Sequence, residues 1–507
     1  MRKARLIALF LIFSMLTCFL ASCSGGGSTV EDGGDRVGDS WDGVNFKGQT
    51  VKLCISINQY DEASFPAADI YTRGPDTAGS NEVAKEVLAR NKQACETLGI
   101  NIEYSERDLP YNKIVEDVRS IVTTSSKNSP DIYNNDINGL SWAMLNGYFW
   151  NVKNPGEGVK NYFDFTKDGW YTEYIKGCTF NQDKYYIFAG DYFIDMIRMA
   201  WVTYVNHDIF KSNLNKMPAW CTSLDEFYSY VKEGIWDIDM MIEIAGAVHA
   251  DSGELGVTER NDTIVGLSFT HVTNIVFPSA SGITLYYLDK DNGYRPCVME
   301  DSNQYQKLAL KFTELMNAKG VFQNATTIQG IKDVTLHFVE GNVLFAMQRL
   351  GEMESTALRD FSAAKGLVPI PKWNQNEQDD YHTVVHNQAE LACILNTAKA
   401  YSASSALMQY LNENSEKVVH AYYEKGLKYK YNDDKNSREM MDIVRDCTDD
   451  PFSLTIGRIC EELYTGTPAL SGMPLNRSST ISSTFASEKD AYIDCMNKAL
   501  EKFKNFP

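Results

Sequence analysis

The stretch NEVAKEVLARNKQACETLGINIEYS, residues 81–105, joins a helix pattern to a strand pattern with no loop between them. In residues 81–99 the apolar side chains recur on one helix face, and Gly99 stands where such a helix would end. INIEYS, residues 100–105, follows directly and is predicted to be a strand. The stretch therefore predicts one helix–strand unit of an α/β sheet.

The same alternation extends to both sides of this unit. TVKLCIS, residues 50–56, is predicted to be a buried strand, residues 111–124 a second helix, and DIYN, residues 131–134, a third short strand. Strands that alternate with helices of this length are typical of a parallel sheet with helices on its faces.

A second region begins with MAWVTYVNHDIF, residues 199–210, predicted to be a strand that leads into a turn. In the helix predicted for residues 222–234, Ser223 and Glu226 have the spacing of a capping box, in which each side chain bonds the other residue's backbone amide. The remaining segments predict helices at 306–320, 404–414 and 489–503 and strands at 366–373 and 389–398. Residues 337–348 are predicted to hold a helix end, a Glu-Gly turn and a strand. On length alone the chain is sufficient for two or three domains.

Charge and cysteine content exclude some classes of function. The formal net charge is −19, and removal of Arg2, Lys3 and Arg5 with an export signal would make it −22. Such a field repels phosphate backbones, so we expect no nucleic-acid partner. The cysteines have neither the spacing of a zinc site nor that of a dense disulfide framework. Cys54 and Cys393 lie in apolar strand-like runs, and we expect buried thiols there with few or no disulfides.

The N-terminus has the pattern of an export signal. Basic residues at positions 2, 3 and 5 precede an apolar run over residues 6–21, which is short for a transmembrane helix. The residues Leu20-Ala21-Ser22-Cys23 resemble the lipobox of bacterial lipoproteins, which implies that residues 1–22 are removed and that Cys23 carries a lipid. Residues 23–45 are rich in Gly, Ser and Asp and are predicted to form a flexible tether. An ordinary signal peptide with an incidental cysteine is the alternative.

Four further blocks, taken in order, resemble the family 1 extracellular solute-binding proteins of ABC importers, the group of maltose-binding protein. They are SPDIYNNDINGLSWAMLNGYFWNV (129–152), WVTYVNHDIFKSN with the following PAWCTSLDEFYSYVKE (201–233), FVEGNVLFAMQRLGEME (338–354) and KGLVPIPKW (365–373). Two positions depart from the family pattern: His207 stands where lysine is usual, and Cys221-Thr222-Ser223-Leu224 replaces the usual Thr-Trp. The resemblance, with the lipobox, covers nearly the whole chain.

The resemblance implies a two-lobed α/β fold of the periplasmic-binding-protein kind, with hinge strands that cross between the lobes. Lobe I would hold residues 46–190 and 385–446, and lobe II residues 195–372 and 450–507, with crossovers near 187–200 and 383–392. It also implies a monomer, anchored by its lipid at the extracytoplasmic face of the cell membrane. There it would capture a small solute, expected to be an oligosaccharide, and deliver it to the subunits of an ABC permease.

Candidate ligand-binding residues are polar side chains that follow predicted strands or lie at the predicted crossovers, where loops of such a sheet converge. They are Asn134, Asn135 and Asn138; Asp191, Tyr192, Asp195 and Arg198; His271; Gln348, Arg349 and Glu352; and His386, Asn387 and Gln388. Tyr111, Trp142 and Trp373 are candidates for stacking on a sugar ring. For each of these residues a structural role remains open: turn formation for the asparagines, surface ion pairs for the charged groups, and core packing for His271 and the aromatic residues.

Enzymatic interpretations have less support. His382 and His386 are four residues apart, but their β-branched run lacks the glutamate of a helical H-E-x-x-H metal site. The sequence has no P-loop and no G-x-S-x-G motif, and we expect no catalytic residue, metal or cofactor. Two alternatives stay open: a surface-anchored glycan hydrolase, because 67 acidic residues offer many carboxylate pairs, and a solute-binding sensor without a permease.

Overall fold

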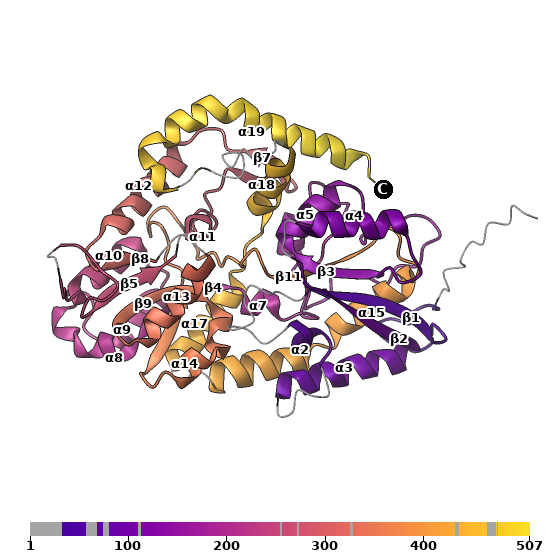
Figure 1. The fold of residues 1–507 in the computed structure, drawn as a ribbon, viewed down its shortest axis with the longest axis horizontal. Coiled ribbons are helices and arrows are strands. Elements are labelled where there is room, and N and C mark those ends of the chain that lie inside the picture. Colours follow the sequence, from indigo (N-terminus) through magenta and orange to yellow (C-terminus); the bar gives the residue numbers. More distant parts are fainter. Residues whose placement is uncertain are drawn as a thin grey trace, which may run out of the picture.

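The computed structural model describes residues 33–56, 68–74, 81–109, 113–253, 256–270, 273–324, 328–430, 435–463, 473 and 475–506. The predicted signal peptide, Cys23, Tyr111 and His271 lie outside the described residues. Two sheets, each covered by helices, form the two lobes seen in Figure 1. The expectation of a two-lobed α/β fold is therefore confirmed.

Lobe I is built on a four-stranded sheet in the order β11-β3-β1-β2, with strands β1 (Gln49–Ser56), β2 (Ile100–Arg107), β3 (Ile132–Asp136) and β11 (Glu390–Ile394). Strands β1, β2 and β3 are parallel, and β11 returns antiparallel to β3. The helices of this part are α2 (Ala68–Thr72), α3 (Glu82–Leu98), α4 (Ile114–Thr124), α5 (Ile137–Leu145), α6 (Thr172–Gly177), α7 (Asp195–Arg198), α15 (Tyr401–Glu413), α16 (Glu416–Val419) and the π-helical η5 (His420–Lys430).

Lobe II holds a five-stranded mixed sheet in the order β10-β4-β9-β5-β8, with strands β4 (Trp201–Asn206), β5 (Val265–Phe269), β8 (Val321–Gln323), β9 (Val343–Arg349) and β10 (Lys365–Pro369). A separate hairpin pairs β6 (Tyr286–Asp289) with β7 (Arg295–Val298). The helices are α8 (His207–Ser212), η3 (Leu214–Lys216), α9 (Leu224–Lys232), α10 (Ile238–Val248), α11 (Thr273–Ala280), α12 (Asn303–Asn317), α13 (Ile328–Val339), η4 (Leu350–Glu354), α14 (Thr356–Asp360) and α17 (Lys435–Asp446), followed by α18 (Phe452–Leu463), η7 (Leu475–Thr480) and α19 (Ile481–Lys504).

Helix α3 shows why the quoted stretch folds as it does. The Asn81 side chain accepts a hydrogen bond from the Ala84 amide and so caps the first turn. Gly99 ends the helix in the left-handed conformation, with φ of 61°, and its amide donates to the Cys95 carbonyl. The buried face, which includes Val87 and Leu98, packs in the core of lobe I, and β2 starts at the next residue.

The cap of α9 differs slightly from the predicted capping box. Ser223 accepts a hydrogen bond from the Glu226 amide at 3.1 Å, as expected. The Glu226 carboxylate, however, accepts from the amide of Thr222, at 2.7 Å, and from its hydroxyl, rather than from the Ser223 amide. The helix start is therefore fixed one residue further upstream than the motif implies.

Cysteines are mostly buried thiols, as expected for Cys54 and Cys393. One disulfide, Cys460–Cys495, joins α18 to α19. In the described part of the chain, no helix has both the length and the apolar character required to span a bilayer.

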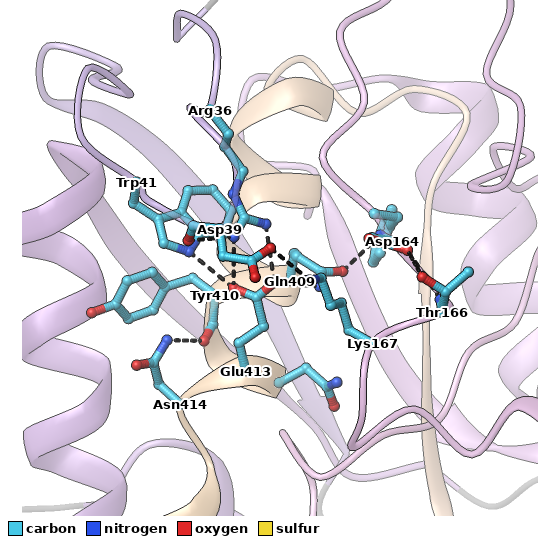
Figure 2. A network of polar contacts seen from close by, with 12 residues as sticks. Arg36, Asp39, Trp41, Asp164, Thr166, Lys167, Gln409, Tyr410, Glu413 and Asn414 are labelled. Carbon is cyan, nitrogen blue, oxygen red and sulfur yellow. Dashed lines mark hydrogen bonds and ion pairs between the residues drawn. The ribbon is translucent and has the colours of Figure 1, made fainter.

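The prediction of a flexible tether as far as residue 45 is wrong for residues 33–45, which we call the N-terminal strap. Trp41 is only 9% exposed, and its ring packs against the rings of Tyr162 and Tyr410. Its indole nitrogen donates to Glu413 at 3.0 Å, and Arg36 binds the same carboxylate through two nitrogens. Figure 2 shows both side chains directed towards Glu413. One tryptophan and one arginine thus dock a segment whose composition is otherwise that of a linker.

Helices near the C-terminus do not follow the expected division of the chain. Residues 435–446 were assigned to lobe I, but α17 packs on β10 and α9 of lobe II, where the Ser437 hydroxyl bonds Tyr228 at 2.9 Å. Helix α19 runs from α12 of lobe II across to α5 of lobe I (Figure 1). Its last turn reaches lobe I through Phe503, whose ring centroid lies 5.3 Å from that of Phe180. The reason is that apolar residues recur along the whole helix and are buried at both ends.

Replacement of Trp41 by alanine tests the strap. Trp41→Ala should lower the free energy of unfolding by about 2–4 kcal/mol, because it removes a buried indole and one of the bonds to Glu413. Urea unfolding of the full chain measures this. Val37→Ala is the matched control, since Val37 lies in the same segment and is 74% exposed, and it should change little. Equal behaviour of the two variants would show that the strap does not contribute to folding.

Candidate functional site

Three segments of the chain lie against one another where the lobes meet, and we call them the crossings. Two of them cross between the lobes, and the third links α17 of lobe II to α18, which packs on α5 of lobe I as well as on β6 of lobe II. The first includes Met199 and Trp201, and the second includes residues 383–387. The Trp201 amide donates to the Val384 carbonyl at 2.9 Å, and the His386 amide donates to the Met199 carbonyl at 2.8 Å. The third, residues 447–451, joins them through a bond of 2.8 Å from the Thr383 amide to the Cys447 carbonyl. Met199, Val384 and His386 lie in the ranges expected for the crossovers, near 187–200 and 383–392, and Trp201 lies one residue beyond the first range.

A cavity of about 720 Å³ opens beside the third crossing. Its walls come from the end of α11, the β6–β7 hairpin, the loop before α12, residues 377–382 and residues 449–454. We call it the outer cavity. Lys290 and His382 also line it. Its carboxylates are those of Glu300, Asp301, Glu377, Asp379, Asp380, Asp449 and Asp450.

A much smaller pocket of about 30 Å³, the inner pocket, extends from the outer cavity to the crossings. The two share Ser279, Asp449, Asp450, Pro451 and Leu454 as lining residues. Trp201 and residues 383–387 line the pocket from the crossings, and Tyr174 of α6 lines it from lobe I. A volume of this size holds a single water or one small polar group.

Tyr174 places a buried hydroxyl group at the inner pocket. The residue is only 3% exposed, and the hydroxyl has no hydrogen-bond partner among the described residues. Burial raises the pKa of Tyr174 well above its usual value, and the nearby carboxylates of Asp136 and Asp450 raise it further. A buried, neutral phenol without a partner costs free energy that a bound polar group would recover.

Asp449 and Asp450 lie in both cavities and differ in ionisation. Burial alone would raise the pKa of Asp449, but the hydrogen bond with His382 and the charge of Lys290 lower it to about 2. Burial and the adjacent Asp449 charge raise the pKa of Asp450. The Lys290 ammonium lies 3.2 Å from Asp449 and 3.3 Å from Asp450. Between the two cavities the protein therefore holds one firmly ionised carboxylate next to one whose ionisation is disfavoured.

The lobes contact one another on the cavity side through the hairpin. Tyr294, in the turn between β6 and β7, donates to Glu173 of α6 at 3.0 Å. Lys176 of the same helix donates to the Tyr294 hydroxyl at 2.8 Å and lies 4.0 Å from its ring centroid. The hairpin of lobe II thus bridges to lobe I at a partly exposed position.

A second set of contacts between the lobes is buried and charged. Arg198 of α7 pairs with Asp195 at 2.5 Å and with Glu354 of η4 at 3.2 Å. Glu354 also accepts hydrogen bonds from Tyr71 of α2 and Tyr422 of η5. The backbone amide of Glu390 donates to Asp195 at 3.0 Å. The predicted residues Asp195 and Arg198 therefore join the lobes, and neither lines either cavity.

Of the predicted ligand residues, the structure brings Asn138, His386 and Asn387 together at the inner pocket. His386 and Asn387 line it. Asn138 donates to the Asn387 carbonyl at 3.2 Å and accepts a bond of 2.6 Å from Arg458 of α18. Gln388 follows directly, and its amide donates to His386 Nδ1.

The residues predicted after β9 form a separate buried group. Arg349 pairs with Glu352 at 2.8 Å, and Thr335 donates to the same carboxylate at 2.9 Å. Gln348 donates to the Thr335 hydroxyl. Their charges satisfy one another inside lobe II, away from both cavities.

The other predicted residues that the structure describes pack against or bond other parts of the protein, and they do not line either cavity. Tyr192 is buried among the rings of Trp170, Phe188 and Phe193, and Asp191 lies 3.9 Å from Arg445. The buried Asn134 and Asn135 are part of β3, where Asn135 donates to the Ser56 hydroxyl. Trp373 is buried, and Trp142 lies beneath Lys502 of α19.

Tyr174, Trp201, Lys290, Asp449 and Asp450 line the cavities and were not predicted as ligand residues. Asp449 and Asp450 are an Asp-Asp pair before Pro451, and such a pair in a sequence predicts a solvated turn. His382 was considered only for a metal site. Among the described residues no group of three or more His, Cys, Asp or Glu side chains is placed to hold a metal ion.

No family model matches the sequence, and no curated protein matches it. Solved structures do match the fold. The GacH receptor of Streptomyces glaucescens, solved alone and with acarbose, aligns over 91% of this chain and 100% of its own, with 11% identity and a TM-score of 0.50. An ABC substrate-binding protein of Listeria monocytogenes in complex with cycloalternan covers 89% and 99%, with 12% identity and a TM-score of 0.50.

A third match is the galacto-N-biose/lacto-N-biose I-binding protein of an ABC transporter of Bifidobacterium longum. It covers 88% of this chain and 98% of its own, with 12% identity and a TM-score of 0.50. The chain therefore has the two-lobed fold of the solute-binding proteins of ABC transporters.

Asp136, the cap of α5 beside the inner pocket, gives a pH-dependent prediction. Burial raises its pKa to about 6, although the Gly139 amide and Arg458 oppose this. The unfolded chain therefore loses this proton at a lower pH than the folded chain does, and stability falls as the pH rises from about 4 to 6. Asn caps helices as well as Asp does. Asp136→Asn should thus raise the free energy of unfolding at about pH 7.5 by about 1–3 kcal/mol and leave it nearly unchanged below about pH 4.

Urea unfolding at both pH values measures the effect. Asp42→Asn, at an exposed position, is the control and should behave alike at both. A gain from Asp136→Asn of the same size at both pH values would contradict the assignment, because the effect must come from the ionised form.

Proposed function

We propose that this chain is an extracytoplasmic receptor that captures a carbohydrate in the inner pocket between its lobes and in the adjoining outer cavity, and delivers it to an ABC permease. Cys23 would carry the lipid that holds it at the membrane. The supporting observation is the position of the inner pocket, which is walled by Tyr174 of lobe I, by all three crossings and by the end of α11 of lobe II. A solute bound there contacts both lobes and stabilises their closed arrangement.

The lining suits a hydroxyl-rich solute. The inner pocket combines the Trp201 ring, the Tyr174 hydroxyl and the polar groups of His386 and Asn387. A pocket of about 30 Å³ admits one hydroxyl group of a sugar, and the ring itself would lie in the adjoining outer cavity of about 720 Å³. The three matched structures are described with acarbose, cycloalternan and lacto-N-biose, which supports the same class of ligand for this chain. We propose His386 and Asn387 as ligand-binding residues, with Asn138 holding Asn387 in place.

Sugar titration of the full chain, purified in detergent, tests the capture of a carbohydrate. Saturable binding of at least one oligosaccharide should change the fluorescence of Trp201, and Trp201→Phe should remove most of that change. Binding should also shift the X-ray scattering profile, because closure alters the arrangement of the lobes. Absence of saturable binding across neutral, acidic and amino sugars would contradict the proposal. Release of shortened glycan would instead indicate a hydrolase.

Labelling with palmitate tests the anchor. Cells that express the full chain should incorporate the label into the protein, and Cys23→Ser should abolish it. Cys18→Ser, five residues earlier in the predicted signal, is the matched control and should keep the label. Label that persists in Cys23→Ser would exclude Cys23 as the lipidated residue.

A further inference from the structure

The outer cavity is far more acidic than the chain as a whole. Seven of its 22 lining residues are Asp or Glu, whereas 67 of the 507 residues of the chain are. Among the residues that the structure describes, Lys290 is the one Lys or Arg that lines it. With His382 neutral, the lining carries a formal charge of −6. Such a concave acidic wall attracts cations and repels anions.

Three of these carboxylates are already paired. Asp449 and Asp450 share Lys290, and Glu377 pairs with Lys307 at 2.8 Å. No ion pair among the described residues involves the other four, Glu300, Asp301, Asp379 and Asp380, and all four are exposed to solvent. Unpaired acids at an exposed rim cost little by themselves, so charge alone does not establish a site.

The inner pocket supplies the second, independent observation. The Tyr174 hydroxyl is buried, lines the pocket and lacks a partner among the described residues. Its oxygen and hydrogen suit a group that can both donate and accept, such as a sugar hydroxyl. The site therefore presents a position for a hydroxyl at its inner end and an excess of negative charge at its mouth. The Lys372 ammonium, which donates to the Asp379 carbonyl, offsets part of the charge of Asp379 and Asp380.

We infer that the cleft binds a polyhydroxylated solute that carries positive charge, of the class of oligosaccharides with free amino groups. This rests on the proposed function and narrows its ligand. One sugar unit would place a hydroxyl against Tyr174 in the inner pocket. The amines of further units would lie in the outer cavity, near Asp301, Asp379 and Asp380.

Three tetramers with the same β-1,4 linkage and length test the inference: one of glucosamine, one of N-acetylglucosamine and one of glucose. At about pH 6 the amines of the first are protonated, since such amines ionise near the range of an α-amino group. Calorimetric titration of the full chain should give a dissociation constant for the glucosamine tetramer at least about tenfold lower than for the other two. Added salt should weaken that binding alone.

Variants connect the effect to this cavity. Asp379→Asn with Asp380→Asn should weaken binding of the glucosamine tetramer several-fold and leave any binding of the glucose tetramer unchanged. Asp490→Asn, an exposed acid on α19, is the matched control and should change neither. Tyr174→Phe removes a hydroxyl that has no hydrogen-bond partner in the described part of the chain, so the fold should persist while binding of every tetramer weakens.

The outcomes separate the two proposals. Equal or tighter binding of the glucose or N-acetylglucosamine tetramer overturns the inference and leaves the carbohydrate receptor standing. Binding of the glucosamine tetramer that ignores Asp379→Asn and Asp380→Asn overturns the inference as well, because another surface would then hold the amines. Absence of saturable binding to these tetramers and to the wider sugar panel overturns both.

Discussion

Backbone hydrogen bonds from Trp201 to Val384, from His386 to Met199 and from Thr383 to Cys447 hold the three crossings side by side. Every residue that faces the inner pocket from the crossings takes its position from these bonds, since residues 383–387 and Trp201 belong to the paired segments themselves. A movement of one lobe relative to the other must therefore occur by small backbone rotations within or next to this narrow region. The inner pocket lies directly against this region.

The contacts on either side of the crossings differ in kind. Glu354 is buried with Arg198, Tyr71 and Tyr422, and breaking one partner away from such a group leaves a desolvated charge, which is costly. The bonds of Tyr294 to Glu173 and Lys176 are partly exposed, where ion pairs and hydrogen bonds contribute little net free energy. The hairpin contacts therefore cost less to break than the buried charged ones, while α18, beside the outer cavity, joins the lobes by the buried bond from Thr455 to the Gly177 carbonyl.

Local patterns predicted the fold well because helix caps and strand runs act over a few residues. Asn81 and Gly99 bound α3 as the sequence implies. The docking of the N-terminal strap on lobe I could not be predicted in this way, because it depends on Glu413 and Tyr410, more than 360 residues away. Residues 435–446 show the same limit: their amphipathic pattern predicts a helix but does not specify which lobe covers its apolar face.

Prediction of the site was less complete for a related reason. Polar residues at strand ends and crossovers include His386 and Asn387, which line the inner pocket. They also include Arg198, Arg349 and Glu352, which form ion pairs inside the protein. Sequence position does not distinguish a charge that faces a cavity from one that faces a partner. Tyr174 and the pair Asp449 and Asp450 lie on a short helix and in a turn, not at strand ends, so their sequence positions do not mark them as ligand residues.

The docked strap also limits how far the protein can move from its proposed anchor. Residues 24–32 alone separate Cys23 from the start of the strap, and nine residues span about 30 Å at most. If Cys23 carries the lipid, lobe I stays within that distance of the bilayer while lobe II is the half free to swing. Encounters with a membrane-embedded partner then become a search over a surface rather than through a volume, which raises the local concentration of one for the other.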